Sequence, residues 1–193
     1  MNKHDGFPGL RFVTGNVRDR QPAFRYVESA PAAFVENLNF YGQKYQSIYC
    51  GWVLMPDHYH FLIYLPPQLR LSDFARDFRS MVARQVIDGL RAREEWRFLM
   101  TFKLAGAPAS PRKSKYELWQ EDEHVVPVGE LDAAKIKLRY LHENPVRAGL
   151  VERAEEWPHS SAQWYVTGQG PVKRMMKIDE FYAKWFGWKG RTA

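Results

Sequence analysis

The segment at residues 55–65 constrains the fold of this chain more than any other. From residue 59 onward, an apolar or aromatic side chain stands at every second position: Tyr59, Phe61, Ile63 and Leu65. Because alternate residues of a strand point to the same face, this row predicts a β-strand with one buried face. A slip of one residue would expose the row, so burial fixes the register. In that register His58 and His60 lie side by side on the opposite face.

The flanking residues predict an antiparallel sheet around this strand. Residues 47–54 are rich in β-forming side chains, and residues 55–57 make a short turn, so the two strands pair as a hairpin. Residues 10–17 predict a first strand. Residues 116–120 predict a fourth.

Apolar residues at helical spacing predict the helices. Pro31 can begin a helix that continues over residues 32–45, because the N–H that proline lacks is not needed in the first turn. Ser72 is the expected N-cap of the next helix. One apolar stripe follows it: Leu71, Phe74, Phe78, Met81, Val82, Val86 and Leu90. Residues 129–143 predict a further helix that buries Leu131, Ala134, Leu138 and Leu141.

The order strand, helix, strand, strand, helix, strand predicts an α+β fold of the ferredoxin-like (RRM-like) type. In this arrangement the helices cover one face of the antiparallel sheet and leave the other face free to carry a site. We expect one domain over residues 1–165, with a basic loop inserted at about residues 105–115. Residues 166–193 are an aromatic and basic tail that we expect to pack back on the domain.

Composition narrows the classes of function. The chain has 193 residues, 45% of them hydrophobic, which is enough for a core. Cys50 is the only cysteine, so an intramolecular disulfide and a multi-cysteine zinc site are excluded. With no signal-peptide pattern and no long apolar run, we expect a cytoplasmic protein without a membrane partner. The net charge of +6 favours a polyanionic partner, with nucleic acid as the first candidate.

Several basic residues are candidates for nucleic-acid contacts. Arg18 and Arg20 lie in a turn-rich stretch, and Arg76 and Arg79 lie off the apolar stripe of their helix. A solvated helix face explains the latter pair equally well. Three more candidates lie in the basic loop: Arg112, Lys113 and Lys115.

The helix at residues 129–143 carries a second polar group. Because Leu138 and Leu141 face the core, Tyr140 points away from them. Lys137 and Asn144 lie three and four residues from Tyr140, so both are its neighbours on a helix. Pro145 disfavours helical geometry at Asn144, so we expect the helix to end there and Asn144 to cap a following turn.

From the residues alone, the histidine pair leaves several readings open. Two imidazoles on a rigid strand can bind a divalent metal or a phosphate, and they can also serve only as hydrogen-bonding partners. A three-histidine zinc site completed by His142 or His124 is a further alternative. Tyr140 alone is typical of a tyrosine packed on a helix surface.

Three motifs in order resemble a known family. His58-Tyr59-His60, preceded by Met55-Pro56-Asp57, matches the histidine–bulky–histidine motif of HUH endonucleases. Residues 140–150 resemble the tyrosine helix of the REP-associated tyrosine transposases, the single-tyrosine branch of that superfamily. Residues 157–162 are similar to a segment that follows this helix in the family. The resemblance runs from about Leu10 to Tyr165.

The resemblance implies cleavage and rejoining of single-stranded DNA through a 5′-phosphotyrosine. It implies that Tyr140 is the nucleophile and that His58, His60 and Asn144 hold Mg²⁺ or Mn²⁺. Imidazole is not a favoured Mg²⁺ ligand, so Mn²⁺ suits this set better. Lys137 and Arg147 are then candidates for activating the nucleophile or contacting phosphate.

The implied partner is single-stranded or hairpin DNA of REP-like repeats, which would place the protein at the nucleoid as a monomer or homodimer. Whether Tyr140 serves its own chain or a partner stays open at this stage. The alternative is a non-catalytic nucleic-acid-binding domain of the same fold, since basic ferredoxin-like domains often bind RNA.

Overall fold

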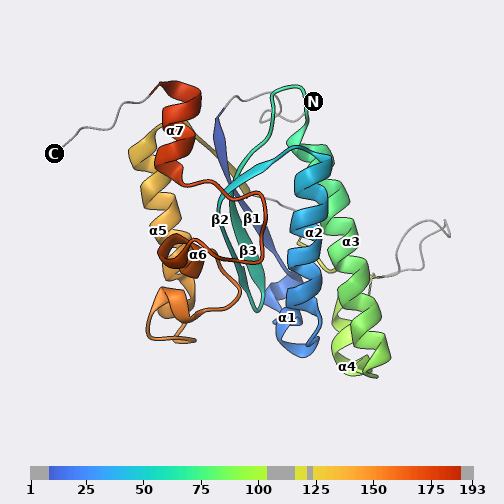
Figure 1. Cartoon of the computed structure of the whole chain (residues 1–193). Helices are drawn as coiled ribbons and strands as arrows, with labels where there is room; N and C mark the ends of the chain where they lie inside the picture. The colour runs from blue at the N-terminus through green and yellow to red at the C-terminus, as the bar shows by residue number, and fades with distance from the viewer. Residues whose placement is uncertain (1–8, 104–115, 121–123, 188–193) are drawn as a thin grey trace.

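The computed structural model describes residues 9–103, 116–120 and 124–187. Its centre is a four-stranded sheet in the order β2-β3-β1-β4, in which every neighbouring pair is antiparallel. The strands are β1 (Leu10–Asn16), β2 (Ile48–Met55), β3 (His58–Tyr64) and β4 (His124–Val128). This order, together with helices that follow the first and third strands, confirms the predicted α+β ferredoxin-like fold (Figure 1).

Two long helices, α2 (Ala30–Lys44) and α3 (Leu71–Ala92), cover one face of the sheet (Figure 1). The alternating row of β3 points into this layer as predicted, and its four side chains are at most 1% exposed. The predicted stripe of α3 is buried except at Met81, which is 36% exposed. The prediction for Ser72 is wrong: α3 begins at Leu71 with Arg70 at the N-cap, so Ser72 lies inside the first turn.

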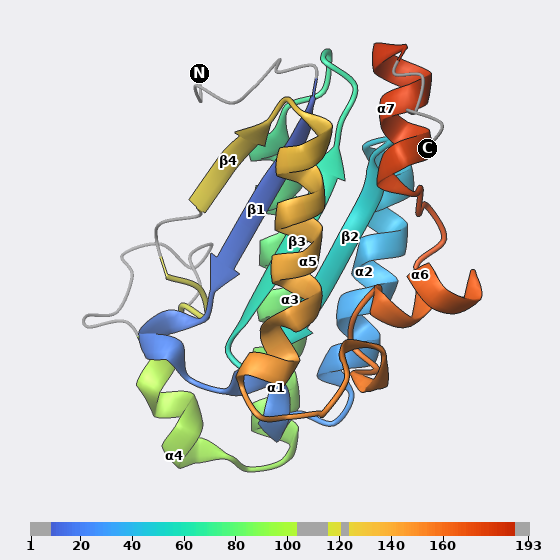
Figure 2. The same ribbon diagram turned by 90° about the vertical axis from the view of Figure 1, so that its left-hand side faces the viewer.

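The other face of the sheet carries a third long helix, α5 (Leu131–Arg147), which crosses in front of the strands in Figure 2. This face is therefore not bare, contrary to the expectation from the sequence. The helix approaches closely because β2 has a glycine there. A Cβ at Gly51 would lie 2.7 Å from Leu138 Cδ1 and 3.1 Å from Leu141 Cδ2.

The predicted end of this helix at Asn144 is wrong, because α5 continues through Pro145 to Arg147. Pro145 is buried, and the N–H groups of Ala148 and Leu150 donate to the carbonyls of Asn144 and Pro145 at 3.0 and 2.9 Å. These bonds and the burial of the proline ring outweigh the local preference of the residue before a proline. Asn144 is therefore a residue within the helix and not a cap.

The predicted fourth strand at residues 116–120 is also wrong, because the fourth strand is β4. Tyr116 and Trp119 make only single bridges, to Lys103 and Val17. Trp119 instead packs its ring near Tyr59, and its Nε1 donates to a carbonyl of α3 at 2.8 Å. The segment also makes isolated backbone hydrogen bonds, from Arg18 N to Leu118 O at 2.8 Å and from Gln120 N to Asn16 O at 2.9 Å, but these do not continue into a strand ladder. β4 tolerates a proline because it is an edge strand.

The chain after α5 packs beside that helix. It contains α6 (Ala162–Thr167) and α7 (Ile178–Phe186), and Phe181 of α7 packs against Tyr64 of β3 at a ring distance of 5.3 Å. Five short elements complete the described part: η1 (Arg18–Arg20), α1 (Ala23–Tyr26), α4 (Trp96–Leu99), η2 (Met100–Phe102) and η3 (Ala154–Glu156). Among the described residues, no helix has the length and apolar character needed to cross a membrane. The predicted basic insertion at residues 105–115 lies outside the described residues.

Candidate active site

The histidine pair lies on the α5 face of β3, buried between the sheet and the helix. His58 and His60 are 7% and 4% exposed, and their ring centroids are 4.9 Å apart. On β1, Asn16 lies opposite His58 and Thr14 lies opposite His60. The structure thus places the two imidazoles side by side, in the register that the apolar row predicts.

A carboxylate contacts the first histidine. Asp57 Oδ1 lies 2.6 Å from His58 Nδ1, and Asp57 Oδ2 lies 2.8 Å from Arg20 Nε. Burial opposes ionisation of Asp57, but the hydrogen bond and charge of His58 and the charge of Arg20 bring its pKa below the usual value. An ionised carboxylate can only accept a hydrogen bond, so His58 Nδ1 carries the proton.

A neutral hydroxyl contacts the second histidine. His60 Nδ1 lies 2.8 Å from Thr14 Oγ1, and its ring stacks on Phe12 at 5.1 Å. Its Nε2 is buried and has no hydrogen-bond partner within the described part of the chain. Burial lowers the pKa of His60 to about 3, helped by repulsion from His58 when that ring is protonated and from the Arg20 and Lys137 cations. In the neutral tautomer that carries its proton on Nδ1, the imidazole donates to Thr14 Oγ1 and presents an Nε2 lone pair to an electrophile or metal.

The tyrosine of α5 packs against the second histidine of this pair. The ring centroid of Tyr140 is 5.5 Å from that of His60 and 5.9 Å from that of Phe12. The side chain is 39% exposed, so its ring contacts the site while part of it faces solvent. The phenol and the imidazole belong to the same chain.

Two cations flank Tyr140. Lys137 Nζ is 5.0 Å from the centre of the Phe12 ring, and the Arg147 guanidinium carbon is 5.2 Å from the centre of the Tyr140 ring. Arg147 also forms an ion pair with Glu143 at 2.6 Å. Both cations can therefore stabilise negative charge next to the phenol.

Asn144 lies one turn after Tyr140 but makes no hydrogen bond to either histidine. Its Nδ2 donates to the carbonyl of Tyr140 at 2.8 Å. The amide oxygen is left without a hydrogen bond to any described residue, so it stays available as an oxygen ligand.

A three-histidine zinc site is not assembled. His142 Nε2 bonds Ser161 Oγ at 2.8 Å, and burial lowers the pKa of His142 to about 4. His124 lies on β4, separated from His60 by the intervening β1 residue Thr14. In the described ranges, no group of three or more His, Cys, Asp or Glu residues is arranged to hold an ion.

The segment at residues 157–161 anchors α5 rather than reaching the histidines. Trp157 Nε1 donates to Leu54 O at 2.9 Å, and Leu54 N donates to His159 O at 2.8 Å. Ser161 Oγ accepts from the backbone N–H of Trp52 at 3.0 Å while it contacts His142 of α5. The segment therefore ties the edge strand β2 to the helix that carries Tyr140.

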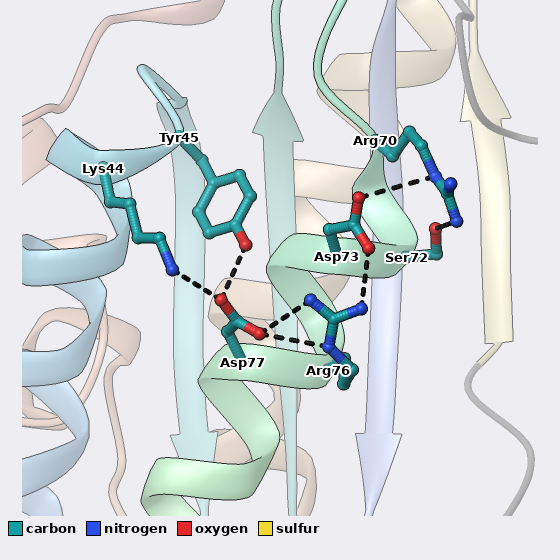
Figure 3. A network of polar contacts seen from close by, with 7 residues as sticks. All are labelled: Lys44, Tyr45, Arg70, Ser72, Asp73, Arg76 and Asp77. Carbon is teal, nitrogen blue, oxygen red and sulfur yellow. Dashed lines mark hydrogen bonds and ion pairs between the residues drawn. The ribbon is translucent and has the colours of Figure 1, made fainter.

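All four described arginine candidates for nucleic-acid contacts are engaged within the protein. On α3, Arg76 forms ion pairs with Asp73 and Asp77, which also bonds Lys44 and Tyr45 (Figure 3). The remaining described candidates have partners too: Arg79 with the Gln120 carbonyl, Arg18 with Glu117, and Arg20 with Asp57. The loop candidates Arg112, Lys113 and Lys115 lie outside the described residues.

Three contributors to this site were missed at the sequence level. Thr14 and Phe12 become neighbours of His60 only through strand pairing, and no local signal marks them. Asp57 precedes His58 in the chain, so its adjacency to a candidate ligand was a usable signal.

Among known proteins, similarity is found at the level of solved structures. No protein-family model and no curated protein matches the chain. A solved structure of a REP-associated tyrosine transposase bound to a REP hairpin aligns with 96% of this chain and 88% of that chain. The identity is 17% and the TM-score is 0.60. The two chains share a fold. A crystal structure of a proposed transposase from Deinococcus radiodurans aligns with 74% of this chain and 97% of that chain, with 19% identity and a TM-score of 0.44.

Proposed function

We propose that the protein is a metal-dependent endonuclease and strand transferase that acts on hairpin-forming single-stranded repeat DNA. The observation that carries the proposal is the position of Tyr140, 5.5 Å from a buried imidazole whose Nε2 has no partner in the described structure. A structural tyrosine would not require an unsatisfied buried nitrogen beside it. The fold shared with a transposase bound to a REP hairpin supports the same proposal.

The residues present fit a divalent metal. His58 and His60 would each contribute Nε2, and Asn144 would contribute its amide oxygen. A set of two nitrogens and one oxygen suits Mn²⁺ better than Mg²⁺. The metal, when bound, would act as a Lewis acid on the scissile phosphate.

Tyr140 would then act as the nucleophile. A bond forms between its phenolic oxygen and phosphorus, the bond from phosphorus to the 3′ oxygen breaks, and the phenolic proton is lost while the 3′ oxygen gains one. Lys137 and Arg147 would stabilise the phenolate and the phosphate charge. The phosphotyrosine bond conserves the energy for rejoining, so the reaction needs no ATP.

The hairpin would approach from the α5 side. Arg139 is exposed on α5 and forms no ion pair or hydrogen bond with any other described residue. The α3 cations Arg76, Arg84 and Arg91 are paired with aspartates instead. Arg147 is paired with Glu143, but Lys137 and Arg139 have no acidic partner among the described residues, which makes this the more attractive surface for phosphates. The earlier candidates Arg18, Arg79 and the loop residues stay predictions.

Formation of a covalent adduct tests the proposal. The full chain is incubated with Mn²⁺ and a labelled hairpin oligonucleotide carrying single-stranded flanks, and the products are separated on a denaturing gel. We expect a covalent protein–DNA band that disappears in Tyr140→Phe. Tyr26→Phe is the matched control, because Tyr26 is 43% exposed and packs against Phe98.

One outcome of this experiment would contradict the proposed function. Binding without an adduct, across many REP-like hairpins and several divalent metals, would favour the non-catalytic nucleic-acid-binding domain.

A further inference from the structure

Two residues outside the proposed metal ligands contact the Nδ1 atom of His58. His58 Nδ1 has two polar neighbours, Asp57 Oδ1 at 2.6 Å and Arg20 Nη2 at 3.3 Å. The carboxylate can only accept a proton and the guanidinium can only donate one. The two neighbours therefore favour opposite tautomers of the imidazole.

We expect Asp57 to determine the tautomer, because its contact with Nδ1 is shorter than that of Arg20 and because it forms an ion pair with Arg20. Arg20 Nε is 2.8 Å from the second oxygen of Asp57, and Arg20 Nη1 is 2.5 Å from Asn16 Oδ1. With its donors engaged in this way, Arg20 orients the carboxylate toward His58. The proton then lies on Nδ1, and Nε2 presents a lone pair.

The backbone that delivers Arg20 is in an uncommon conformation. Asp19 and Arg20 have φ values of 52° and 55°, in the left-handed region where residues other than glycine are uncommon. Such residues persist where surrounding contacts over-determine them, often at functional sites. The end of β1 is also tied to the turn, because Val17 N donates to Asp57 O at 2.8 Å.

We propose that Asp57, oriented by Arg20, is a positioning residue that holds His58 in the tautomer whose Nε2 can bind a metal. The inference rests on the proposed function for its purpose, but the tautomer itself can be measured in the metal-free protein. It also gives Arg20 a role different from the phosphate contact predicted from the sequence.

Nitrogen-15 NMR of the imidazoles tests the inference without metal or DNA. Spectra of the full chain at pH 8, where an ordinary imidazole is neutral, should show His58 protonated at Nδ1 and bare at Nε2. In Asp57→Ala, Arg20 becomes the only polar neighbour of Nδ1, so the proton should move to Nε2. In Asp57→Ala/Arg20→Met, neither neighbour remains, and the two tautomers should mix.

Controls keep this test interpretable. Asp73→Ala removes another arginine-paired aspartate, on α3, and should leave the His58 signals unchanged. Asp57→Asn is the variant of nearly equal size in case Asp57→Ala fails to fold; its amide can accept or donate, so it should also give a mixture. The proposal is overturned if wild-type His58 carries its proton on Nε2, or if the tautomer is unchanged in every folded Asp57 variant.

Mn²⁺ affinity, followed by electron paramagnetic resonance, gives a second readout. Loss of a residue that orients a histidine ligand costs about 10–100-fold in metal affinity, and we expect that loss in Asp57→Ala. If the tautomers behave as expected but wild-type protein forms no DNA adduct, the proposed function fails and the positioning role stands.

Hairpin binding separates the two roles of Arg20. Arg20→Met should leave the salt dependence of hairpin binding unchanged if Arg20 only positions Asp57. A decrease of about one in the slope of log K against log salt would mark a phosphate contact and overturn this part of the inference.

Discussion

The two faces of the central sheet are made by the same strands, yet their side chains differ in kind. On the α2 and α3 face, β3 contributes Tyr59 and Phe61, which pack with Phe34 and Phe78 in a closed aromatic layer. On the α5 face, alternate residues of the same strand contribute the two histidines. The period of two in a strand thus lets one segment supply both the core and the candidate site.

The helices on the two sides also differ in how their charged residues are paired. On α3, each aspartate is paired with arginine, and Asp77 also with Lys44. On α5, Lys135 and Arg147 are paired with acidic residues, but Lys137 and Arg139 have no acidic partner among the described residues. Paired charges favour solubility and helix stability, whereas unpaired cations beside a nucleophile favour an anionic substrate.

The largest effect on activity is expected on the α5 face. His60→Ala removes the imidazole below Tyr140, and we expect adduct formation to fall by about 1000-fold or more, consistent with loss of a catalytic group. Hairpin affinity should stay within about tenfold, because phosphate contacts elsewhere dominate binding. A filter-binding titration and the denaturing gel measure the two quantities. A parallel loss of both would indicate that His60 is structural.

A mixing experiment sharpens this prediction. Tyr140 lies over His60 of its own chain, so a mixture of Tyr140→Phe and His60→Ala proteins should form no adduct. Recovery of the adduct in the mixture would show that the tyrosine of one chain serves the histidines of another.

On the opposite face, the expected effect is on stability. Phe78 is fully buried and packs against five aromatic rings: Phe34, Tyr41, Tyr59, Phe61 and Phe74. Phe78→Ala should lower the free energy of unfolding by about 4 kcal/mol, the usual range for a buried phenylalanine. Urea denaturation measures this change. A cost below about 1 kcal/mol would mean that this layer collapses around the lost ring.

Sequence patterns within a single segment correctly predicted the features that depend on that segment alone. Alternation in β3 was sufficient for its register, its buried row and the histidine pair. These patterns failed where a contact with a residue far away in the sequence outweighs the local backbone preference. Burial of Pro145 carries α5 past its expected end. Residues 116–120 are held by the contacts of Trp119 and by isolated backbone hydrogen bonds, without forming a strand. Thr14 joins His60 only through the pairing of β1 with β3, which no single segment encodes.

A glycine-to-alanine substitution can be made on each face of the sheet, so the cost of overpacking can be compared directly between the faces. A Cβ at Gly15 would overlap the buried ring of Tyr59, whereas a Cβ at Gly51 would meet the flexible tips of Leu138 and Leu141 of α5. Overpacking costs about 1–3 kcal/mol. We therefore expect Gly15→Ala near the upper end and Gly51→Ala near the lower end, measured by urea denaturation.

Activity should rank the same two variants in the opposite order. Moving α5 by a few tenths of an ångström displaces Tyr140 from the histidines, so Gly51→Ala should slow adduct formation by about tenfold. The folded fraction of Gly15→Ala should keep most of its rate. Equal rates in both variants would show that the contact at Gly51 does not position the tyrosine.

The smallest effect is expected at the charge network between α2 and α3 (Figure 3). Hydrogen bonds from Lys44 and Tyr45, with a further one from Arg76, lower the pKa of Asp77 to about 2. A lowered carboxyl pKa stabilises the fold above the unfolded value near 4, and this contribution is lost as the pH falls from about 4 to about 2. Because Asp77 is partly exposed, screening reduces the contribution, and we expect Asp77→Asn to cost about 1 kcal/mol at pH 7.

The pH dependence of that difference is the decisive measurement. Urea denaturation of wild type and Asp77→Asn at pH 7, 5, 4 and 3 should give a difference that is constant down to about pH 5 and then shrinks. Asp88→Asn is the control, because Asp88 forms only exposed pairs along α3 and should cost less than about 0.5 kcal/mol. A difference that persists unchanged at pH 3 would mean that Asp77 stabilises the helices by packing and not by charge. In that case both the aromatic layer and Asp77 would stabilise the α3 side by packing. The two faces of the sheet would then differ in their aromatic side chains and not in their paired charges.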